Sequence, residues 1–168
     1  EAFKKIQLIK PYLSSRSQQI DNYNTENEID KILAVNGRNL TNIGVFRKYV
    51  QEYLKNYPAV NKEMTLMVRQ MPPSPQGIPL EIYAFSTDKR WENYEYIMAD
   101  IFDHLLAALP YFQHEVYELP VSFQGTSGQS NWMAINPFWF GRFLKSTTAF
   151  PIVAFVVTGH LNPPVSKN

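Results

Sequence analysis

The chain contains no cysteine, which excludes disulfide bonds, thiolate nucleophiles and thiolate metal ligands. It also has little net charge, because 16 basic residues stand against 15 acidic ones and give a formal charge of +1. Such a balance creates no overall field that would attract nucleic acid or an anionic membrane surface. The composition therefore favours a protein that binds no nucleic acid, and the lack of cysteine is compatible with a reducing cytoplasm.

Long hydrophobic runs are missing as well. The most apolar stretch, Phe150 to Val157, is far shorter than the ~20 residues that a membrane-spanning helix needs. The chain begins at Glu1 rather than Met, and its first apolar residues are interspersed with Lys4, Lys5 and Lys10, which is not a signal-peptide pattern. We therefore expect a soluble segment that begins inside a longer protein.

The residues that are present indicate a globular protein. Of the 168 residues, 45% are hydrophobic and 14% are aromatic, which is too rich a content for general disorder. The length suits one domain with an appendage. We expect an N-terminal helix and polar linker over residues 1–40, a folded domain over residues 41–121, and a tail without assigned structure over residues 122–168.

The first forty residues predict one helix. Residues 3–20 carry Phe3, Ile6 and Leu13 at roughly helical spacing, with charged side chains between them. Residues 21–39 are polar and rich in asparagine, and they predict at most a short helix or a flexible excursion.

Two further helices have start and stop signals. Thr41–Asn42 offers a side-chain cap for a helix that Pro58 ends, and Asp88 offers a cap for a helix that Pro110 ends. Both helices carry an apolar stripe that is expected to face the core. The stripes are Phe46, Val50, Tyr53 and Tyr57 in the first helix, and Trp91, Tyr94, Met98, Ile101, Leu105 and Ala108 in the second.

Between these helices the sequence predicts an antiparallel hairpin. Residues 64–71 and 80–86 are rich in β-branched, aromatic and long apolar residues, and the Pro/Gly segment 72–77 cannot continue either strand. Strand alternation would point Leu80, Ile82 and Ala84 to one face and Glu81, Tyr83 and Phe85 to the other. Tyr83 and Phe85 are therefore the candidate residues of a subunit interface.

The order of the elements indicates an α+β protein. Residues 114–121 predict a last strand, with Val116, Leu119 and Val121 available to the core. A ferredoxin-like sandwich runs strand, helix, strand, strand, helix, strand, so this chain is expected to be a truncated sandwich without its first strand. Truncation would leave an exposed sheet edge, with a helical region before the sandwich and an irregular tail after it.

The residues suggest no metal or cofactor site. Asp100 and His104 are four apart on a predicted helix, a spacing that can place two ligands on one metal. Two ligands do not make a site, and the remaining histidines, His114 and His160, have no acidic cluster near them. A surface hydrogen bond or a helix-end interaction is the favoured interpretation of Asp100 and His104, and no cofactor is expected.

Catalytic patterns are also missing. Ser122, Ser127 and Ser130 lie in loop sequence without the pattern of a nucleophile elbow. Residues 125–128 lack both the spacing and the lysine of a phosphate-binding loop. We therefore expect that the chain is not an enzyme.

Three patterns have alternative interpretations. Tyr83 and Phe85, with Arg69 beside them, superficially resemble an RNA-binding sheet, but packing against another subunit or the tail is favoured because the recognition signature is absent. The aromatic and basic residues of 137–145 could rest at a membrane interface, although burial against protein is favoured. The glycosylation sequon at Asn39 is better explained by chance or by helix capping.

Four sequence blocks together resemble one family, the small-conductance mechanosensitive channels of bacteria, in the miniconductance branch. The resemblance extends from about residue 10 to about residue 117. The blocks are Lys10-Pro11-Tyr12-Leu13, then Thr41-Asn42-Ile43-Gly44 with Phe46-Arg47 and Glu52-Tyr53-Leu54, then the hairpin over 64–85, and Ala99-Asp100-Ile101-Phe102-Asp103-His104.

The resemblance implies a membrane channel that opens under bilayer tension and releases ions and small osmolytes after hypoosmotic shock. It implies a cytoplasmic vestibule built as a ring, usually a heptamer, with a β domain near the membrane and an α/β domain further in. This chain resembles only the α/β domain. Membrane attachment at the cytoplasmic face of the bacterial inner membrane would come from upstream helices that the chain lacks, and no pore-lining residue is carried over.

Two hypotheses follow from the sequence. The favoured one is a cytoplasmic channel fragment that contributes to subunit assembly and to the vestibule. The alternative is a free-standing ferredoxin-like module that binds a small ligand or RNA. A first strand supplied by the tail would favour the module, whereas an open sheet edge would favour the truncated channel domain.

Overall fold

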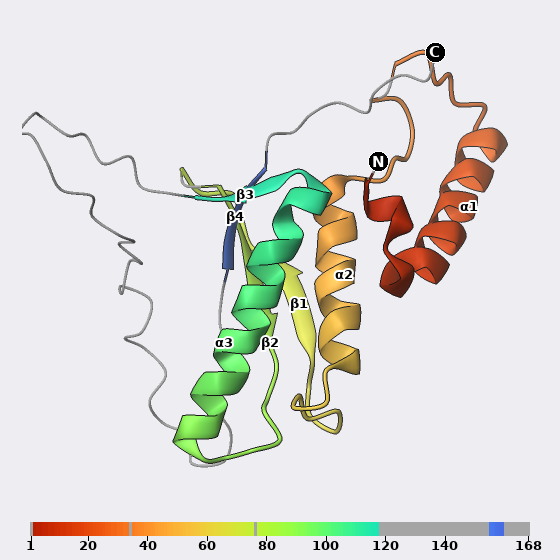
Figure 1. The fold of residues 1–168 in the computed structure, drawn as a ribbon. Helices are drawn as coiled ribbons and strands as arrows, with labels where there is room; N and C mark the ends of the chain where they lie inside the picture. The colour runs from red at the N-terminus through yellow and green to blue at the C-terminus, as the bar shows by residue number, and fades with distance from the viewer. Residues whose placement is uncertain (1, 34, 76, 118–154, 160–168) are drawn as a thin grey trace, which may run out of the picture.

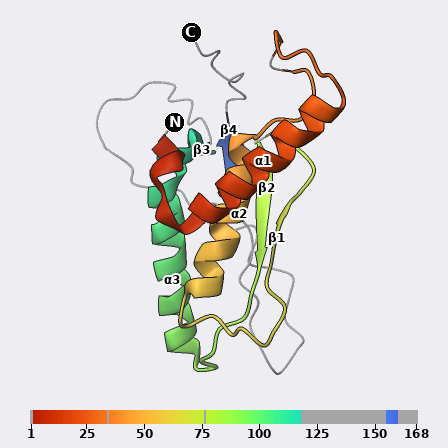
Figure 2. The ribbon, with the colours of Figure 1, turned by 90° about the vertical axis from the view of Figure 1, so that its right-hand side faces the viewer.

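The computed structural model describes residues 2–33, 35–75, 77–117 and 155–159. Over these residues the protein is α+β, with three α-helices and a four-stranded antiparallel sheet. In Figure 1 the helices α2 and α3 lie side by side across one face of the sheet, and α1 lies beyond α2. Figure 2, turned by a right angle, shows α1 crossing in front of the α2 layer.

The N-terminal region forms two short 3-10 helices, η1 (Ala2–Lys5) and η2 (Gln7–Ile9), followed by α1 (Lys10–Glu26). The α-helix therefore begins later and ends later than the predicted range of 3–20. Pro11 explains the start, because proline has no amide hydrogen and is tolerated only in the first turn. Ile9 and Leu13 are buried against α2 and belong to the common core.

A hydrogen-bonded loop follows α1 where the sequence predicted a short helix or a flexible excursion. Asn24 fastens it at both polar atoms of its amide, since Nδ2 donates to the carbonyl of Arg38 at 3.0 Å and Oδ1 accepts from the Arg38 amide at 2.9 Å. Gly37 has a φ of 68°, and a Cβ there would lie 2.4 Å from the Asn24 oxygen. The loop therefore needs glycine at this position.

Helix α2 (Asn42–Asn56) confirms the predicted cap, because the Thr41 hydroxyl accepts a hydrogen bond from the Gly44 amide at 3.3 Å. The helix ends just before Tyr57 and Pro58, close to the predicted stop. Lys62 then donates to the carbonyls of Leu54 and Tyr57, at 2.7 and 2.5 Å. This ammonium satisfies carbonyls that every helix leaves free at its C-terminus.

The predicted hairpin is present as β1 (Met67–Gln70) and β2 (Ile78–Tyr83). Its inward face is as predicted, since Leu80, Ile82 and Ala84 are fully buried. These side chains meet α2 and α3 in one core. The largest fully buried side chains are Phe46, Phe112, Ile9, Leu54, Leu80, Ile82, Ile101, Leu105, Leu109, Val45 and Val50. Burial of each large aliphatic or aromatic group stabilises the fold by roughly 1.5–3 kcal/mol.

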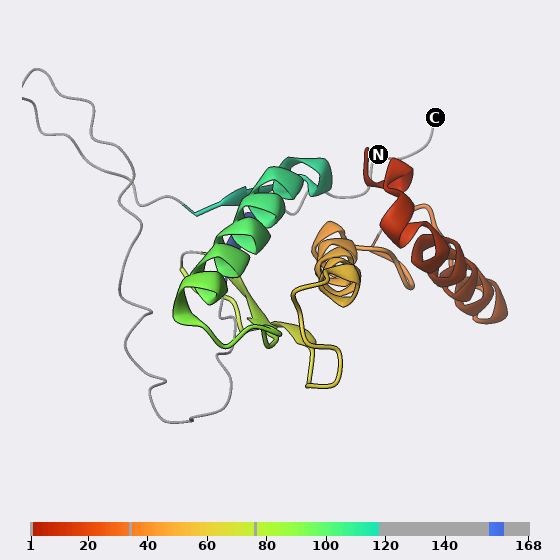
Figure 3. The same ribbon diagram turned by 60° about the horizontal axis from the view of Figure 1, so that its bottom comes forward.

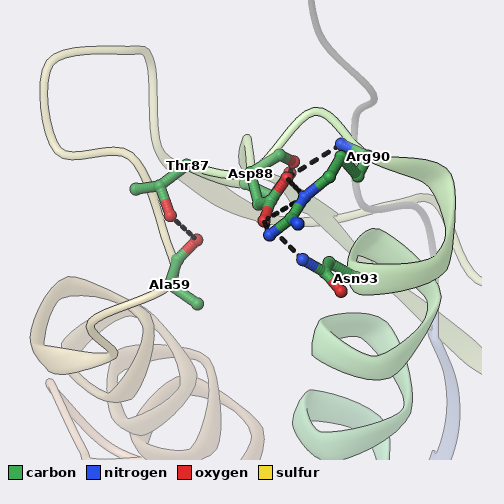
Figure 4. Close-up of polar contacts among 6 residues, drawn as sticks. Ala59, Thr87, Asp88, Arg90 and Asn93 are labelled. Carbon is green, nitrogen blue, oxygen red and sulfur yellow. Dashed lines mark hydrogen bonds and ion pairs between the residues drawn. The ribbon is translucent and has the colours of Figure 1, made fainter.

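Helix α3 (Trp91–Ala108) has its predicted range, but its predicted cap is wrong. Asp88 accepts from the Arg90 amide at 2.9 Å and from the Asn93 side chain at 2.5 Å, rather than from the amides of the first turn (Figure 4). Beside it, the Thr87 hydroxyl and amide both donate to the carbonyl of Ala59, at 3.3 and 2.9 Å. Asp88 thus organises the turn that leads into α3. Trp91 is 59% exposed and does not join the predicted stripe.

The last two strands correct the predictions for the C-terminal part. After a 3-10 turn, η3 (Leu109–Phe112), β3 spans only His114–Val116. Val116 was predicted to join the core, but it is 40% exposed. His114 is the buried residue of this strand. His114 and Val116 share one face of the strand, because side chains alternate, but Val116 lies at the end of an edge strand and stays partly exposed. Leu119 and Val121 lie outside the described residues.

The tail contains a strand, although no structure was predicted for residues 122–168. Strand β4 (Phe155–Gly159) pairs antiparallel with β2 on one side and with β3 on the other, so the sheet order is β1-β2-β4-β3. The exposed edge that loss of the first strand was expected to leave is therefore not open, because β4 pairs there. The edges of the sheet are instead β1 and β3. The aromatic and β-branched run of β4 is a strand signal that the sequence analysis missed.

Candidate interaction surface

The outer face of the hairpin carries the predicted interface residues. Met67 stands opposite Tyr83, and Arg69 stands opposite Glu81. Because side chains alternate along a strand, these residues lie on the face away from α2 and α3. Arg69 and Glu81 form an ion pair across the strands, and the Glu81 carboxylate raises the pKa of Arg69. The pair is exposed and contributes little to stability.

Tyr83 and Phe85 contact each other on this face. Their ring centroids are 5.0 Å apart and their planes meet at 88°, which is the edge-to-face geometry that aromatic rings prefer. Phe85 is only 8% exposed, whereas Tyr83 is half-buried. The surface that another molecule could contact therefore comes mainly from Tyr83. A buried Phe85 offers no free ring face on which a base could stack.

A second polar cluster lies between α2 and α3. Tyr57 donates its hydroxyl to Oδ2 of Asp100 at 3.2 Å, and the Tyr49 hydroxyl lies 2.6 Å from Nε2 of His104. The ring of Tyr53 stacks on His104, with centroids 3.9 Å apart and planes 4° apart. Asp100 and His104 therefore have the hydrogen-bonding role that was predicted for them.

Burial decides the protonation of this cluster. It raises the pKa of Tyr49, and together with the charges of Tyr57, Tyr49 and Asp100 it raises the pKa of Tyr53 to about 12. It also lowers the pKa of His104. Tyr49 and Tyr53 are thus protonated at pH 7, and burial favours the neutral form of the His104 imidazole. Among the described residues, no three His, Asp or Glu side chains gather as a metal site would require.

Sequence reasoning missed the setting of His114. Its side chain is 2% exposed, lies edge-on to Phe46 with centroids 5.7 Å apart, and has no hydrogen-bond partner within the described chain at either ring nitrogen. Burial lowers the pKa of His114, and the nearby backbone of Asn42 opposes this only in part. His114 also lines an open hollow of about 570 Å³ together with Leu106, Leu109, Pro110, Glu115, Val116 and Tyr117.

Several sequence candidates lie outside the described residues. These are Ser122, Ser127, Ser130, residues 137–145 and His160. The sequon residue Asn39 is described, and its side-chain oxygen accepts from Lys31 at 2.8 Å. None of the helices in the described ranges combines the length and the apolar character that crossing a bilayer requires.

The outer face of the hairpin offers a surface for contact with another molecule. In the described part of the chain, no nucleophile, base and orienting group come together as catalysis would require. Its chemistry is that of packed aromatic rings and paired charges on an α+β scaffold. No family model matches the chain. No solved structure matches it significantly.

Proposed function

We propose that the chain is the cytoplasmic α/β domain of a mechanosensitive channel subunit of the small-conductance superfamily, in its miniconductance branch. The domain contributes to subunit assembly and to the vestibule that ions and small osmolytes cross after hypoosmotic shock. It catalyses nothing. In the full-length parent it lies at the cytoplasmic face of the bacterial inner membrane, to which upstream helices attach it.

The observation that carries the proposal is where the four resembling blocks lie. The first opens α1, the second spans α2, the third forms β1 and β2, and the fourth lies within α3. Each block supplies a residue to the same core, namely Leu13, Phe46, Ile82 and Ile101 in chain order. The resemblance thus covers residues that determine packing rather than surface loops, which supports a shared fold.

Phe46 and Ile101, from the second and fourth blocks, are both completely buried and belong to one core.

The sheet supports a ferredoxin-like arrangement for this domain. Counting α2, β1, β2, α3 and β3 in chain order gives helix, strand, strand, helix, strand, which is the ferredoxin-like order without its first strand. Strand β4 occupies the place between β2 and β3. In the proposed parent, a strand from upstream of residue 1 takes this central place, and β4 competes with it.

A second function is favoured by the same strand. Because β4 takes the position between β2 and β3, the chain is also compatible with a free-standing ferredoxin-like module that binds a small ligand or RNA. A strand supplied by the tail was the feature expected to favour this module, and β4 comes from the tail. The RNA-binding form is the weaker one, since Phe85 is buried and Arg69 is paired with Glu81.

One experiment separates the two functions. Membranes carrying the full-length parent gene are recorded by patch clamp under graded suction, with and without the segment that corresponds to residues 1–168. Tension-gated currents that change on removal of the segment support the channel. A parent gene that encodes no membrane-spanning helices upstream of Glu1, or membranes without any tension response, would replace the channel by the module.

The role of Tyr83 in assembly is tested in the same parent. Tyr83→Ser removes the most accessible ring of the hairpin face, so we expect fewer intact rings in detergent extracts. Tyr96→Ser is the matched control, because Tyr96 is 65% exposed on α3 and has no place on that face. Equal ring yields from the two variants would exclude the hairpin face as the interface.

A further inference from the structure

The loop after α1 contains Asn36, which is the only asparagine of the sequence that is followed by glycine. Glycine has no Cβ, so the backbone nitrogen of Gly37 can approach the side-chain carbonyl carbon of Asn36 with little steric hindrance. Attack of that nitrogen on Cγ closes a cyclic imide and expels ammonia, which is the first step of asparagine deamidation. Asn36 is therefore the position at which the local sequence most favours this reaction.

The shape of the loop requires the glycine of this pair. Gly37 has a φ of 68°, and a Cβ on it would lie 2.4 Å from Oδ1 of Asn24 and 2.7 Å from Cγ2 of Ile29. Any larger residue would therefore be strained at this position. Gly37 is also exposed, so water reaches the peptide bond that joins it to Asn36. The fold thus presents a glycine to solvent directly after the asparagine.

The amide nitrogen of Gly37 is available as a nucleophile. Among the described residues, none accepts a hydrogen bond from the Gly37 amide. Its neighbours differ, because the Asn36 amide donates to the carbonyl of Leu33 at 3.0 Å and the Arg38 amide donates to Oδ1 of Asn24 at 2.9 Å. Removal of the Gly37 amide proton therefore breaks no hydrogen bond within the described chain.

A positive charge lies on the same peptide group. Nζ of Lys31 donates to the Asn36 carbonyl at 2.7 Å, and further bonds to Oδ1 of Asn39 at 2.8 Å and to the carbonyl of Arg38 at 3.3 Å hold the ammonium in place. When the Gly37 nitrogen loses its proton, amide resonance shares the negative charge with the Asn36 carbonyl oxygen. A hydrogen bond from an ammonium stabilises that anion. Lys31 therefore increases the population of the nucleophile.

The side chain of Asn36 is held by a single exposed hydrogen bond, since Nδ2 donates to the carbonyl of Asp30 at 2.8 Å. Such a neutral bond at the surface contributes little net free energy and opens readily. The carboxylate of Asp30 accepts from the Ile32 amide at 2.8 Å, so the path of the chain at Asp30 does not depend on Asn36 alone. The Asn36 side chain can therefore turn toward the Gly37 nitrogen while the loop keeps its shape.

We propose that Asn36 is a site of spontaneous deamidation in the folded protein and that Lys31 promotes the reaction. Water removes the Gly37 amide proton, and the nitrogen then forms a bond to Cγ of Asn36. The bond between Cγ and Nδ2 breaks as Nδ2 takes up a proton and leaves as ammonia. Water opens the cyclic imide at either carbonyl, which gives aspartate or isoaspartate at position 36. The reaction needs no oxidant, reductant or cofactor, and the inference does not depend on the channel proposal.

Deamidation changes the bonds that hold the loop. A carboxylate at position 36 cannot donate to the Asp30 carbonyl, and isoaspartate adds a backbone methylene directly before Gly37, where Asn24 leaves no space. We expect the Arg38 amide to lose its bond to Asn24 as a result. In Figures 1 and 3 the loop lies on one side of α2 and α3 lies on the other, so α3 is expected to remain unchanged.

Peptide mapping by mass spectrometry tests the modification. The full chain is incubated near neutral pH at physiological temperature, and samples are digested over a time course. The peptide that contains Asn36 is expected to gain about 1 Da and to separate into aspartate and isoaspartate forms. Asn27 and Asn39 are internal controls, because both are exposed but are followed by Glu28 and Leu40, whose side chains hinder attack. Their peptides are expected to keep their mass over the same time.

The role of Lys31 is tested by its replacement. Lys31→Met keeps a long side chain without the charge, so the rate at Asn36 is expected to fall roughly tenfold. Lys31→Arg keeps a positive charge and is the matched control, with a rate close to that of the unmodified sequence. In urea the ammonium is no longer held over the Asn36 carbonyl, so Lys31→Met and the original chain should react equally fast. Hydrogen exchange at the Arg38 amide checks that the loop of each variant remains formed.

Two results would overturn the inference. The first is a folded chain whose Asn36 keeps its mass while the chain in urea is converted, because the fold would then protect the site. The second is a folded Lys31→Met variant that reacts as fast as the original chain, or one that remains slower in urea. The effect on the loop has its own test, since Asn36→Asp should lose hydrogen-exchange protection at the Arg38 amide and Asn36→Gln should keep it. Equal protection in these two variants would reject the predicted release of the loop.

Discussion

The body formed by α2, the hairpin and α3 differs sharply from the loop over residues 27–40. In the body, apolar side chains face inward, and residues such as Phe46 and Ile82 are almost completely buried. In the loop, polar side chains bond the backbone and the aliphatic residues point outward. Burial of apolar side chains therefore orders the body, whereas hydrogen bonds from side-chain amides and from the Lys31 ammonium order the loop.

The largest effect is expected from breaking the body. Phe46→Ala removes a fully buried ring that contacts Phe112 and His114, with centroids 5.1 and 5.7 Å away. A cavity of this kind lowers the free energy of unfolding by about 3–5 kcal/mol. Urea titration followed by circular dichroism measures the change. A loss similar to that of the exposed control Tyr96→Ala would show that the body does not depend on this packing.

The same comparison explains what the sequence could predict. Helical spacing and strand alternation follow from burial, so α2, α3 and the inward residues Leu80 and Ile82 were predicted correctly. The loop escaped prediction because Asn24 and Arg38 are fourteen residues apart, and no local pattern announces a bond between them. Hydrogen bonds of this kind depend on how the chain returns in space.

The site was predicted less well for related reasons. Tyr83 and Phe85 were placed on one face, but the burial of Phe85 depends on neighbours that alternation does not reveal. Asp88 was identified as the cap of a helix, yet it bonds the Arg90 amide and the Asn93 side chain instead of the backbone amides of the first turn. Pairing of β4 between β2 and β3 is a long-range event that tail composition did not suggest.

An effect of intermediate size is expected from breaking the loop. Asn24→Ala removes the acceptor of the Arg38 amide and one of two donors to the Arg38 carbonyl, which keeps its bond from Lys31 at 3.3 Å. Loss of such bonds costs about 1–3 kcal/mol. Native-state hydrogen exchange should show loss of protection at the Arg38 amide, with little change in α3. Asn27→Ala is the control, because Asn27 bonds only the exposed end of α1. Equal losses from the two variants would mean that Asn24 does not organise the loop.

The junction between the two regions is expected to respond more weakly. Thr41 caps α2 directly after the loop, and Thr41→Ala removes the acceptor for the Gly44 amide. Loss of an N-cap residue typically costs about 1 kcal/mol. Thr41→Ser, which keeps the hydroxyl, is the matched control in thermal denaturation. If both variants melt together, the hydroxyl does not act as a cap.

His114 is the exception inside the body, because it is polar, buried and without a hydrogen-bond partner in the described chain. Its lowered pKa means that the unfolded chain binds the proton more readily. The free energy of unfolding is therefore not reduced by His114 above about pH 6.5, the ordinary histidine pKa. It falls as the pH decreases from there toward the lowered pKa of the folded protein. His114→Phe should gain up to about 1 kcal/mol at pH 7 and show less acid sensitivity.

Urea titrations at several pH values between neutral and mildly acidic measure this effect. His104→Phe is the comparison, since the pKa of His104 is lowered as well but its Nε2 lies 2.6 Å from the Tyr49 hydroxyl. That variant gives up a hydrogen bond and is expected to lose stability at pH 7. An unchanged acid dependence in His114→Phe would contradict a buried, neutral imidazole at this position.

The smallest effect is expected on the solvent side of α2, where neither burial nor a backbone bond is involved. Glu52 lies 2.6 Å from the Lys48 ammonium and 3.2 Å from that of Lys55, and these partners lower its pKa. Exposed pairs one turn apart contribute about 0.3–0.5 kcal/mol, so Glu52→Gln should cost no more than this, and less in high salt. Glu63→Gln, in the exposed loop before β1, is the control. A loss as large as that of Asn24→Ala would mean that surface charge, rather than burial or amide bonding, also orders this chain.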